Sequence, residues 1–369
     1  MFDSKRVLIY AVCLTLIALM AAFAAPPGTQ TLALATLAAP NPSLPATGEE
    51  IIPTATLVAN VADGQTPAPT PTPLHPFAIE SMRARDYPGS DIIIEQVLEP
   101  GSNYQRYIVS YQSDGLKIYA LMTMPDGDKP APGWPVIVFN HGYIQPGQYR
   151  TTERYVAYQD ALARAGYITF KSDYRGHGKS EGTPSGHLAP GYTIDVLNAV
   201  GSLKKYPDAD PNRIGMWGHS LGGEITLRAM VISGDITAGV IWAGTVAPPA
   251  EQLGMWGGSR GGHGLPSAPR ELTEQYGTPE ENPEFWASLS ATSYLGYLSG
   301  PVQLQHGEAD QEVPLSWSQA LYDAINQAGR VVEIYTYPGS DHNISQAFDL
   351  VMQRTIAFFD KYTKGDEPN

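Results

Sequence analysis

Short apolar runs alternate with amphipathic stretches from residue 77 to the C-terminal end of the chain. Apolar runs bounded by turn residues predict strands, and apolar positions spaced three or four apart predict helices. The predicted strands are Ile92–Leu98, Arg106–Tyr111, Lys117–Thr123, Pro135–Phe139, Ile168–Ser172, Arg213–Trp217, Gly239–Trp242, Val302–Gln305 and Val331–Thr336. The predicted helices are Thr152–Ala165, Ile194–Lys205, Leu221–Ile232, Leu315–Gln327 and Ser345–Tyr362.

The order of these elements indicates the fold class. Strands and helices alternate in the C-terminal part, and the strands are apolar on both faces, which is typical of a mostly parallel sheet sandwiched by helices. The early strands follow one another directly, so we expect antiparallel pairs at one edge. Residues 246–300 interrupt the alternation with Gly, Pro, Trp and Tyr. The sequence therefore predicts an α/β domain over residues 77–364, with residues 246–300 as an insertion that forms a partial lid.

The N-terminal part has a different pattern. Lys5 and Arg6 precede an uncharged apolar stretch over residues 7–25, so residues 1–24 are predicted to be a signal peptide. The stretch is close to the about 17–20 residues needed to span a bilayer, and without cleavage it would tether the chain to a membrane. Either way we expect an extracellular, periplasmic or cell-surface location. Residues 25–76 are rich in Pro, Thr and Ala, which predicts a disordered linker.

The composition of the chain argues against some classes of function. The 369 residues include 23 Lys or Arg and 37 Asp or Glu, and the formal net charge is −14. This charge argues against a nucleic-acid partner, because phosphate binding needs a basic surface. Apolar residues make up 43% of the chain, enough for one large core. The single cysteine, Cys13, lies in the N-terminal stretch, which excludes disulfides, thiolate zinc sites and a cysteine nucleophile from the predicted domain.

Three segments match the pattern G-x-S-x-G, namely 178–182, 218–222 and 257–261. The pattern is short enough to arise by chance, so its context decides. Ser220 alone lies between a predicted strand and a predicted helix, where a tight turn exposes the hydroxyl and the helix N-terminus stabilises negative charge. Ser180 is followed by a Gly- and Pro-containing stretch, and Ser259 lies in a Gly-rich loop. We therefore predict that Ser220 is a nucleophile.

A nucleophilic serine needs a base within hydrogen-bond reach and an acid that orients the base. Two later loops follow predicted parallel strands, and their ends lie at the same edge of the sheet as the Ser220 turn. One loop contains Asp310 and the other contains His342. We assign Asp310 as the acid and His342 as the base, with Glu308 and Glu312 as rival acids.

The chain order Ser220, Asp310, His342 resembles the nucleophile, acid, base order of the α/β-hydrolase superfamily. The likeness covers roughly residues 92–362 and is carried further by Gly218-His219-Ser220-Leu221-Gly222-Gly223. Residues 173–182 are similar to a loop of prolyl oligopeptidase catalytic domains and dienelactone-hydrolase-like esterases. The resemblance implies an α/β-hydrolase fold and serine hydrolase activity. Leu221 departs from the peptidases, which usually have Tyr there.

The same resemblance implies an oxyanion hole. In Asn140-His141-Gly142-Tyr143, directly after a predicted strand, the family uses the backbone N–H of the residue after His-Gly. That residue is Tyr143 here, and the second donor is the N–H of Leu221. Losing one such donor typically costs ~10²–10³ in rate.

Other polar residues are expected to have structural roles. Asp173 is expected to anchor the Arg175 loop, and Asp341 to accept hydrogen bonds within its own loop. Neither a His-Glu-x-x-His helix nor a G-x-x-x-x-G-K-[ST] loop occurs in the sequence. We therefore expect no metal and no cofactor. Four histidines beside glycines are expected to hydrogen-bond loop backbone: His141, His177, His219 and His306.

The leading hypothesis is a secreted serine hydrolase that forms an acyl-enzyme on Ser220 and cleaves small or medium carboxylic esters. The alternative is a serine-type peptidase acting on short peptides, and the second alternative is a non-catalytic extracellular binding domain of the same fold. The expected partner is thus a small-molecule ester or a short peptide. A hydrolase should have Ser220 Oγ within about 3.5 Å of a ring nitrogen of His342.

Overall fold

The computed structural model describes residues 74–257 and 267–365. The predicted signal peptide over residues 1–24 and the predicted linker as far as residue 73 lie outside the described residues. Ser259 and the side chain of Trp256 also lie outside them. Within the two described ranges, no helix combines the length and the apolar composition needed to cross a membrane.

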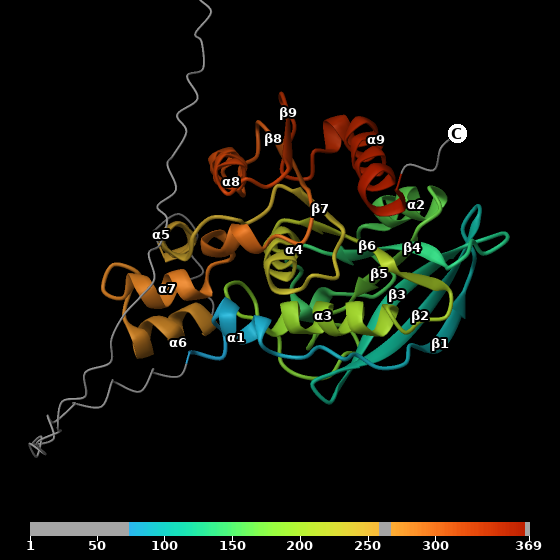
Figure 1. The fold of residues 1–369 in the computed structure, drawn as a ribbon, viewed down its shortest axis with the longest axis horizontal. Helices are drawn as coiled ribbons and strands as arrows, with labels where there is room; N and C mark the ends of the chain where they lie inside the picture. Colours follow the sequence, from blue (N-terminus) through green and yellow to red (C-terminus); the bar gives the residue numbers. More distant parts are fainter. Residues whose placement is uncertain (1–73, 258–266, 366–369) are drawn as a thin grey trace, which may run out of the picture. The chain divides into compact units, whose positions relative to one another are not determined.

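The described residues contain a nine-stranded sheet with the order β1-β2-β3-β5-β4-β6-β7-β8-β9 (Figure 1). The pairs from β1 to β5 along this order are antiparallel, and all the others are parallel. The predicted fold class is confirmed. The strands are β1 (Ile93–Leu98), β2 (Tyr104–Ser113), β3 (Leu116–Pro125), β4 (Trp134–Asn140), β5 (Ile168–Ser172), β6 (Ala209–His219), β7 (Ala238–Trp242), β8 (Val302–Gly307) and β9 (Val332–Tyr337).

Helices connect the parallel strands and fill the insertion. The α-helices are α1 (Ile79–Arg83), α2 (Val156–Arg164), α3 (Gly191–Leu203), α4 (Leu221–Ile232), α5 (Pro249–Gly257), α6 (Ser267–Tyr276), α7 (Pro283–Leu289), α8 (Leu315–Gln327) and α9 (Phe348–Phe359). Short 3₁₀ and π segments are η1 (Pro146–Gln148), η2 (Ala291–Tyr297), η3 (Ser345–Ala347) and η4 (Asp360–Lys364).

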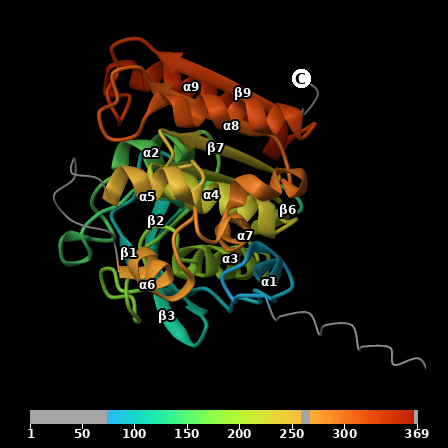
Figure 2. The same ribbon diagram turned by 90° about the vertical axis from the view of Figure 1, so that its left-hand side faces the viewer.

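Successive residues of the central strands point to opposite faces of the sheet. In β4, Val138 belongs to the apolar cluster that includes buried residues of α3, α4 and α8, whereas Phe139 belongs to the cluster that includes those of α2 and α9. Phe139 also stacks on Trp217 of β6, with ring centroids 4.2 Å apart. Accordingly, α8 and α9 lie on opposite sides of β8 and β9 (Figure 1 and Figure 2). The parallel strands are thus covered on both faces, and their C-terminal ends meet at one edge.

Some helix boundaries differ from the sequence-based expectation. α2 begins at Val156 rather than Thr152, because Arg154 and Tyr155 have φ angles of 57° and 53°. These values belong to the left-handed region, which a right-handed helix does not contain. α1 and the insertion helices α5, α6 and α7 were not predicted, since helices this short carry little periodicity.

The insertion packs onto the domain through a small apolar cluster of its own. Trp286 of α7 is 2% exposed and packs with Leu272, Leu289 and, outside the insertion, Leu188. Its indole N–H donates to the carbonyl of Gly277 at 3.0 Å. Trp286 therefore stabilises the insertion.

Candidate active site

Ser220 lies in a sharp turn between the end of β6 and the start of α4. Its φ of 55° and ψ of −120° form a strained conformation that L-residues rarely adopt. Glycine is required on both sides of it: a Cβ on Gly218 would lie 2.1 Å from the carbonyl oxygen of Gly222, and a Cβ on Gly222 would lie 2.0 Å from the carbonyl oxygen of Asn140. The turn therefore holds Ser220, which is half-buried, directly after the C-terminal end of β6.

Ser180, the other candidate serine that lies within the described residues, has a different environment. The Ser180 hydroxyl accepts a hydrogen bond from the backbone N–H of Tyr119 at 2.9 Å, in a loop packed against β3. It joins no strand to a helix, so its role is to fix this loop.

Asp310 follows β8 and His342 follows β9, and the structure brings the two side chains together. The Nδ1 of His342 lies 2.8 Å from Oδ2 of Asp310. Because an ionised carboxylate only accepts hydrogen bonds, Nδ1 carries the proton and donates it. In a neutral imidazole, Nε2 is then the unprotonated nitrogen that can act as a base.

The Asp310 carboxylate is buried, with 1% of its side chain exposed. Burial alone raises its pKa, but hydrogen bonds from His306, from His342 and from the backbone N–H of Val313 outweigh this effect. The pKa of Asp310 consequently lies well below its usual range. His306 was expected only to fix backbone, and it does so at the carbonyl of Val313, yet its Nε2 also lies 3.1 Å from Oδ2 of Asp310.

The other carboxylates of these loops lie elsewhere. Glu308 accepts a hydrogen bond from the Thr336 hydroxyl at 2.8 Å on the surface. Asp341 accepts from the backbone N–H of Ser345 at 2.9 Å, as predicted for a loop acceptor. Glu312 lies on the opposite side of the imidazole, with Oε2 3.8 Å from Nε2 of His342. Only Asp310 is hydrogen-bonded to Nδ1, so neither Glu308 nor Glu312 has the position of an orienting acid.

Ser220 and His342 line one open cavity of about 450 Å³. Within the part of the chain that the structure describes, however, no hydrogen bond joins the Ser220 hydroxyl to His342. Catalytic hydrogen bonds are often long in enzymes without substrate and shorten in the substrate complex. The cavity is lined by Gly142, Tyr143, Ile144, Arg154, Tyr155, Tyr158, His219, Ser220, Glu312, His342 and Asn343. Among described residues, the insertion contributes none of this lining.

Two backbone N–H groups border the nucleophile. Leu221 is the first residue of α4, and the first N–H groups of a helix have no intrahelical acceptor. Tyr143 lies in the loop after β4 and lines the cavity, and none of the described residues accepts a hydrogen bond from its N–H. The assignment of these two N–H groups to an oxyanion hole stays a prediction of the resemblance.

A hydrogen-bonded relay joins the loop after β4 to the base loop. The N–H of Gly142 donates to the Tyr155 hydroxyl at 3.0 Å, and this hydroxyl lies 2.8 Å from Nδ1 of His219. Nε2 of His219 lies 3.0 Å from the carbonyl oxygen of His342, so Nε2 carries the proton and Nδ1 accepts from Tyr155. His219 is thus a positioning residue held between the Ser220 turn and the His342 backbone.

Lys171 supports this relay from inside the sheet. It is fully buried in β5, and its ammonium group donates to the backbone carbonyls of Glu153 and Arg154 at 3.1 and 3.2 Å. Burial lowers its pKa, although the nearby Asp173 opposes the shift. These two bonds hold the backbone of Glu153 and of the left-handed Arg154, which precede Tyr155. Sequence reasoning missed Lys171 and Tyr155; the only local signal was a lysine inside an otherwise uncharged strand.

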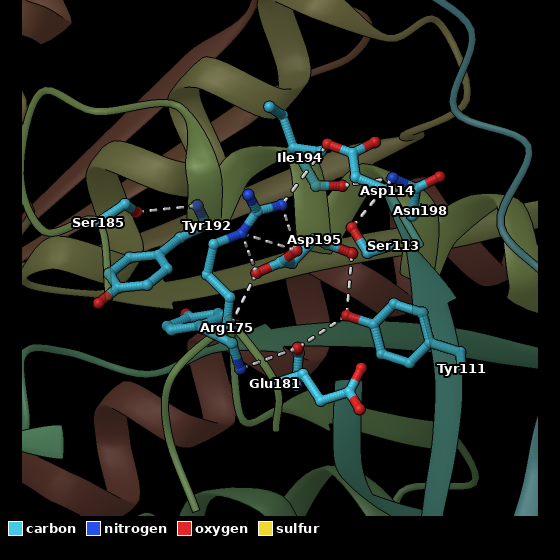
Figure 3. A network of polar contacts seen from close by, with 12 residues as sticks. Tyr111, Ser113, Asp114, Arg175, Glu181, Ser185, Tyr192, Ile194, Asp195 and Asn198 are labelled. Carbon is cyan, nitrogen blue, oxygen red and sulfur yellow. Dashed lines mark hydrogen bonds and ion pairs between the residues drawn. The ribbon is translucent and has the colours of Figure 1, made fainter. Parts of the chain in front are cut away.

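The Arg175 loop is anchored by α3. Figure 3 shows Arg175 beside Asp195, whose carboxylate accepts from the Arg175 backbone N–H at 2.8 Å and from Nη2 at 2.7 Å. The expectation that Asp173 anchors this loop is wrong. Asp173 accepts instead from the hydroxyls of Tyr149 and Thr151. The reason is tertiary, since α3 packs beside the loop and presents a carboxylate that the local sequence does not reveal.

The four histidines named above, each beside a glycine, fix backbone, which confirms that prediction. Among the residues that the structure describes, no group of three or more His, Cys, Asp or Glu side chains could hold a metal ion. Each histidine lies within hydrogen-bond distance of a backbone carbonyl: His141 of Gly142, His177 of Arg175 and Ile144, His219 of His342, and His306 of Val313.

Acidification should destabilise the fold through two of these histidines. Burial lowers the pKa of His141 and of His219 to about 3. In the unfolded chain both titrate near the ordinary value of about 6.5, so between roughly pH 6 and 4 the unfolded state binds more protons. Stability then falls as the pH is lowered, by about 1 kcal/mol per pH unit for each histidine.

The thermal midpoint measured between pH 7 and 4.5 checks this expectation. In His219→Gln, the side-chain amide can donate to the His342 carbonyl and accept from Tyr155 but has no titrating group. Its midpoint should fall less than that of the wild type over the same interval. Equal falls in the two proteins would contradict the assignment of His219 as a buried neutral imidazole.

Comparison with known proteins places this site in a family. Residues 154–366 match the model of the prolyl oligopeptidase family. Two curated relatives are an uncharacterized peptidase, YtmA, of Bacillus subtilis (24% identical, covering 66% of this chain and 88% of the relative) and a probable dipeptidyl-aminopeptidase B of Talaromyces marneffei (26% identical, covering 74% and 30%). The chain therefore spans most of the first relative but less than a third of the second.

Solved structures agree on the fold. An acylaminoacyl peptidase bound to Z-Gly-Gly-Phe-chloromethyl ketone matches with a TM-score of 0.57 at 24% identity, covering 73% of this chain and 43% of that one. An acetyl xylan esterase from Paenibacillus sp. R4 matches with a TM-score of 0.58 at 17% identity, covering 76% and 91%. Both peptidases and esterases share this architecture. The chain belongs to the prolyl oligopeptidase family and is a serine hydrolase with an α/β-hydrolase fold.

Proposed function

We propose that this chain hydrolyses carboxylic esters through an acyl-enzyme on Ser220, with His342 as the base and Asp310 as the acid that orients it. The hydrogen bond from Nδ1 of His342 to Asp310 carries the proposal, because it leaves Nε2 available as the base. Ser220 lines the same cavity as this imidazole. The strained turn of Ser220 gives the hydroxyl access to a substrate.

The reaction follows from these positions. Nε2 of His342 takes the proton of the Ser220 hydroxyl as Oγ attacks the ester carbonyl carbon. The N–H groups of Tyr143 and Leu221 stabilise the negative charge on the carbonyl oxygen. The imidazolium returns its proton to the departing alcohol, and the acyl group remains on Oγ. Water then attacks the acyl-enzyme with the same base, releases the carboxylic acid and restores the serine.

Esters are the proposed substrates because Leu221 replaces the tyrosine usual in peptidases that the sequence resembles. Short peptides are the second candidate, favoured by the family match and by relatives that are named as peptidases. A location outside the cytoplasm is part of the proposal, and it rests on the apolar stretch that follows Lys5 and Arg6. If this apolar stretch is not cleaved, it would also tether the chain to a membrane.

A fluorophosphonate probe tests the nucleophile and the substrate class together. We expect one phosphonate adduct per chain, located on Ser220 by peptide mass spectrometry. The same preparation should hydrolyse short acyl p-nitrophenyl esters with a higher kcat/KM than aminoacyl p-nitroanilides. A faster turnover of the anilides would favour the peptidase, and an adduct on another serine would contradict the proposed triad.

A further inference from the structure

Glu312 is a carboxylate beside the reacting nitrogen that the proposed mechanism does not use. Its Oε2 lies 3.8 Å from Nε2 of His342, whereas Asp310 occupies the Nδ1 side of the ring. Glu312 also lines the cavity that contains Ser220. Its side chain is 70% exposed, compared with 7% for His342, so the carboxylate is open to a molecule entering the cavity.

The fold holds the Glu312 backbone, while the carboxylate has the His342 imidazole as a neighbour at 3.8 Å. The backbone N–H of Glu312 donates to Oδ1 of Asp310 at 2.7 Å, which fixes the position of Glu312 relative to the catalytic loop. Its carboxylate, in contrast, accepts no hydrogen bond from any residue in the described ranges. A carboxylate exposed in this way is free to accept hydrogen bonds from a cationic group of a ligand.

The surroundings favour a cationic ligand. Arg154 lines the same cavity, yet no ion pair joins it to Glu312 among the described residues. Arg154, the one Arg or Lys among the described cavity residues, therefore leaves the Glu312 carboxylate accessible to a ligand. The chain as a whole carries a net charge of −14, which raises the local concentration of cationic substrates.

We propose that Glu312 is a specificity-determining residue that binds a protonated amine of the substrate beside the scissile carbonyl. This inference rests on the proposed function, since it names the substrate class of the same site. During reaction Nε2 approaches Ser220 Oγ to about 3 Å, so the ester carbonyl carbon lies within about 7 Å of the Glu312 carboxylate. An ammonium that hydrogen-bonds to this carboxylate at about 2.8 Å therefore lies only a few bonds from the carbonyl. Amino esters fit this requirement.

The amine could belong to the acyl group or to the leaving alcohol, and two substrate pairs distinguish these sources. For the acyl side, kcat/KM is measured by pH-stat for alanine methyl ester and N-acetylalanine methyl ester. For the leaving-group side, it is measured for 2-(dimethylamino)ethyl acetate and its neutral isostere 3-methylbutyl acetate. For each pair, the cation preference is the kcat/KM of the cationic ester divided by that of the neutral ester. In at least one pair, we expect this ratio to be about tenfold higher for the wild type than for Glu312→Gln.

Glu308→Gln is the matched control. It makes the same change of charge in the same loop, but Glu308 bonds to Thr336 and does not line the cavity. Its cation preference should equal that of the wild type, whereas Glu312→Lys should disfavour the cationic substrates still further than Glu312→Gln.

The outcomes separate the subsite from the proposed function. If Glu312→Gln slows both members of a pair equally, Glu312 stabilises the imidazolium and the amine subsite is overturned, while the ester hydrolase stands. If the wild type, Glu312→Gln and Glu308→Gln all have the same cation preference, Glu312 does not recognise the amine and the subsite is also overturned. If no ester is hydrolysed and the fluorophosphonate does not label Ser220, both proposals fail.

Discussion

Replacing Ser220 by alanine should lower kcat on every ester substrate by about 10⁵–10⁶-fold and abolish fluorophosphonate labelling. The variant loses the only atom that can form the acyl-enzyme, and the base alone activates water poorly. The fold should be retained, because the Ser220 hydroxyl donates no hydrogen bond to a described residue. Residual activity and labelling are measured on protein purified from a host that lacks its own esterases.

Ser180→Ala is the matched control for this prediction. It alters the other described G-x-S-x-G match and removes the hydroxyl that accepts from the Tyr119 backbone N–H. This loss should cost about 1 kcal/mol of stability. Labelling and kcat should persist. If labelling survives in Ser220→Ala but disappears in Ser180→Ala, the nucleophile is Ser180 and the proposed triad is overturned.

Asp310→Asn should lower kcat by about 10⁴-fold with little change in KM. An asparagine keeps the oxygen that accepts from the backbone N–H groups of Glu312 and Val313, so the loop should remain folded. Its amide N–H group, however, would face Nδ1 of His342, which favours the tautomer with the proton on Nε2. That nitrogen can then no longer accept the proton of Ser220. Single-turnover kinetics of acylation measure the loss directly.

Asp341→Asn provides the comparison for this variant. Asp341 is adjacent to His342 in the chain, but its carboxylate accepts from the Ser345 backbone N–H rather than from the imidazole. Its kcat should stay close to that of the wild type. An Asp310→Asn enzyme with more than about a tenth of wild-type activity would mean that Glu308 or Glu312 can replace the acid.

The strands were predictable because each is a local pattern. All nine predicted apolar runs are strands, and β5, α4 and α8 have the predicted boundaries. The Ser220 turn was equally local, since a strand, two glycines and a helix within a few residues leave one compatible geometry. The start of α2 was misplaced because Arg154 and Tyr155 are left-handed, and the Arg154 backbone is held by Lys171 from β5. The start of α9 was misplaced because Ser345–Ala347 form a 3₁₀ segment and Ala347 has a non-helical φ of −122°.

The sequence by itself determined the fold class and predicted three residues of a triad in their order along the chain, because periodicity, glycine spacing and strand-end loops are encoded over short distances. Only the tertiary structure decided which side chains support them. Tyr155 and His219 are 64 residues apart, and His219 and His342 are 123 apart, yet they form one relay. It also decided that Asp195 holds Arg175 and that Glu312 lies on the Nε2 side of the base. Such contacts form only when distant strands align, so no local pattern specifies them.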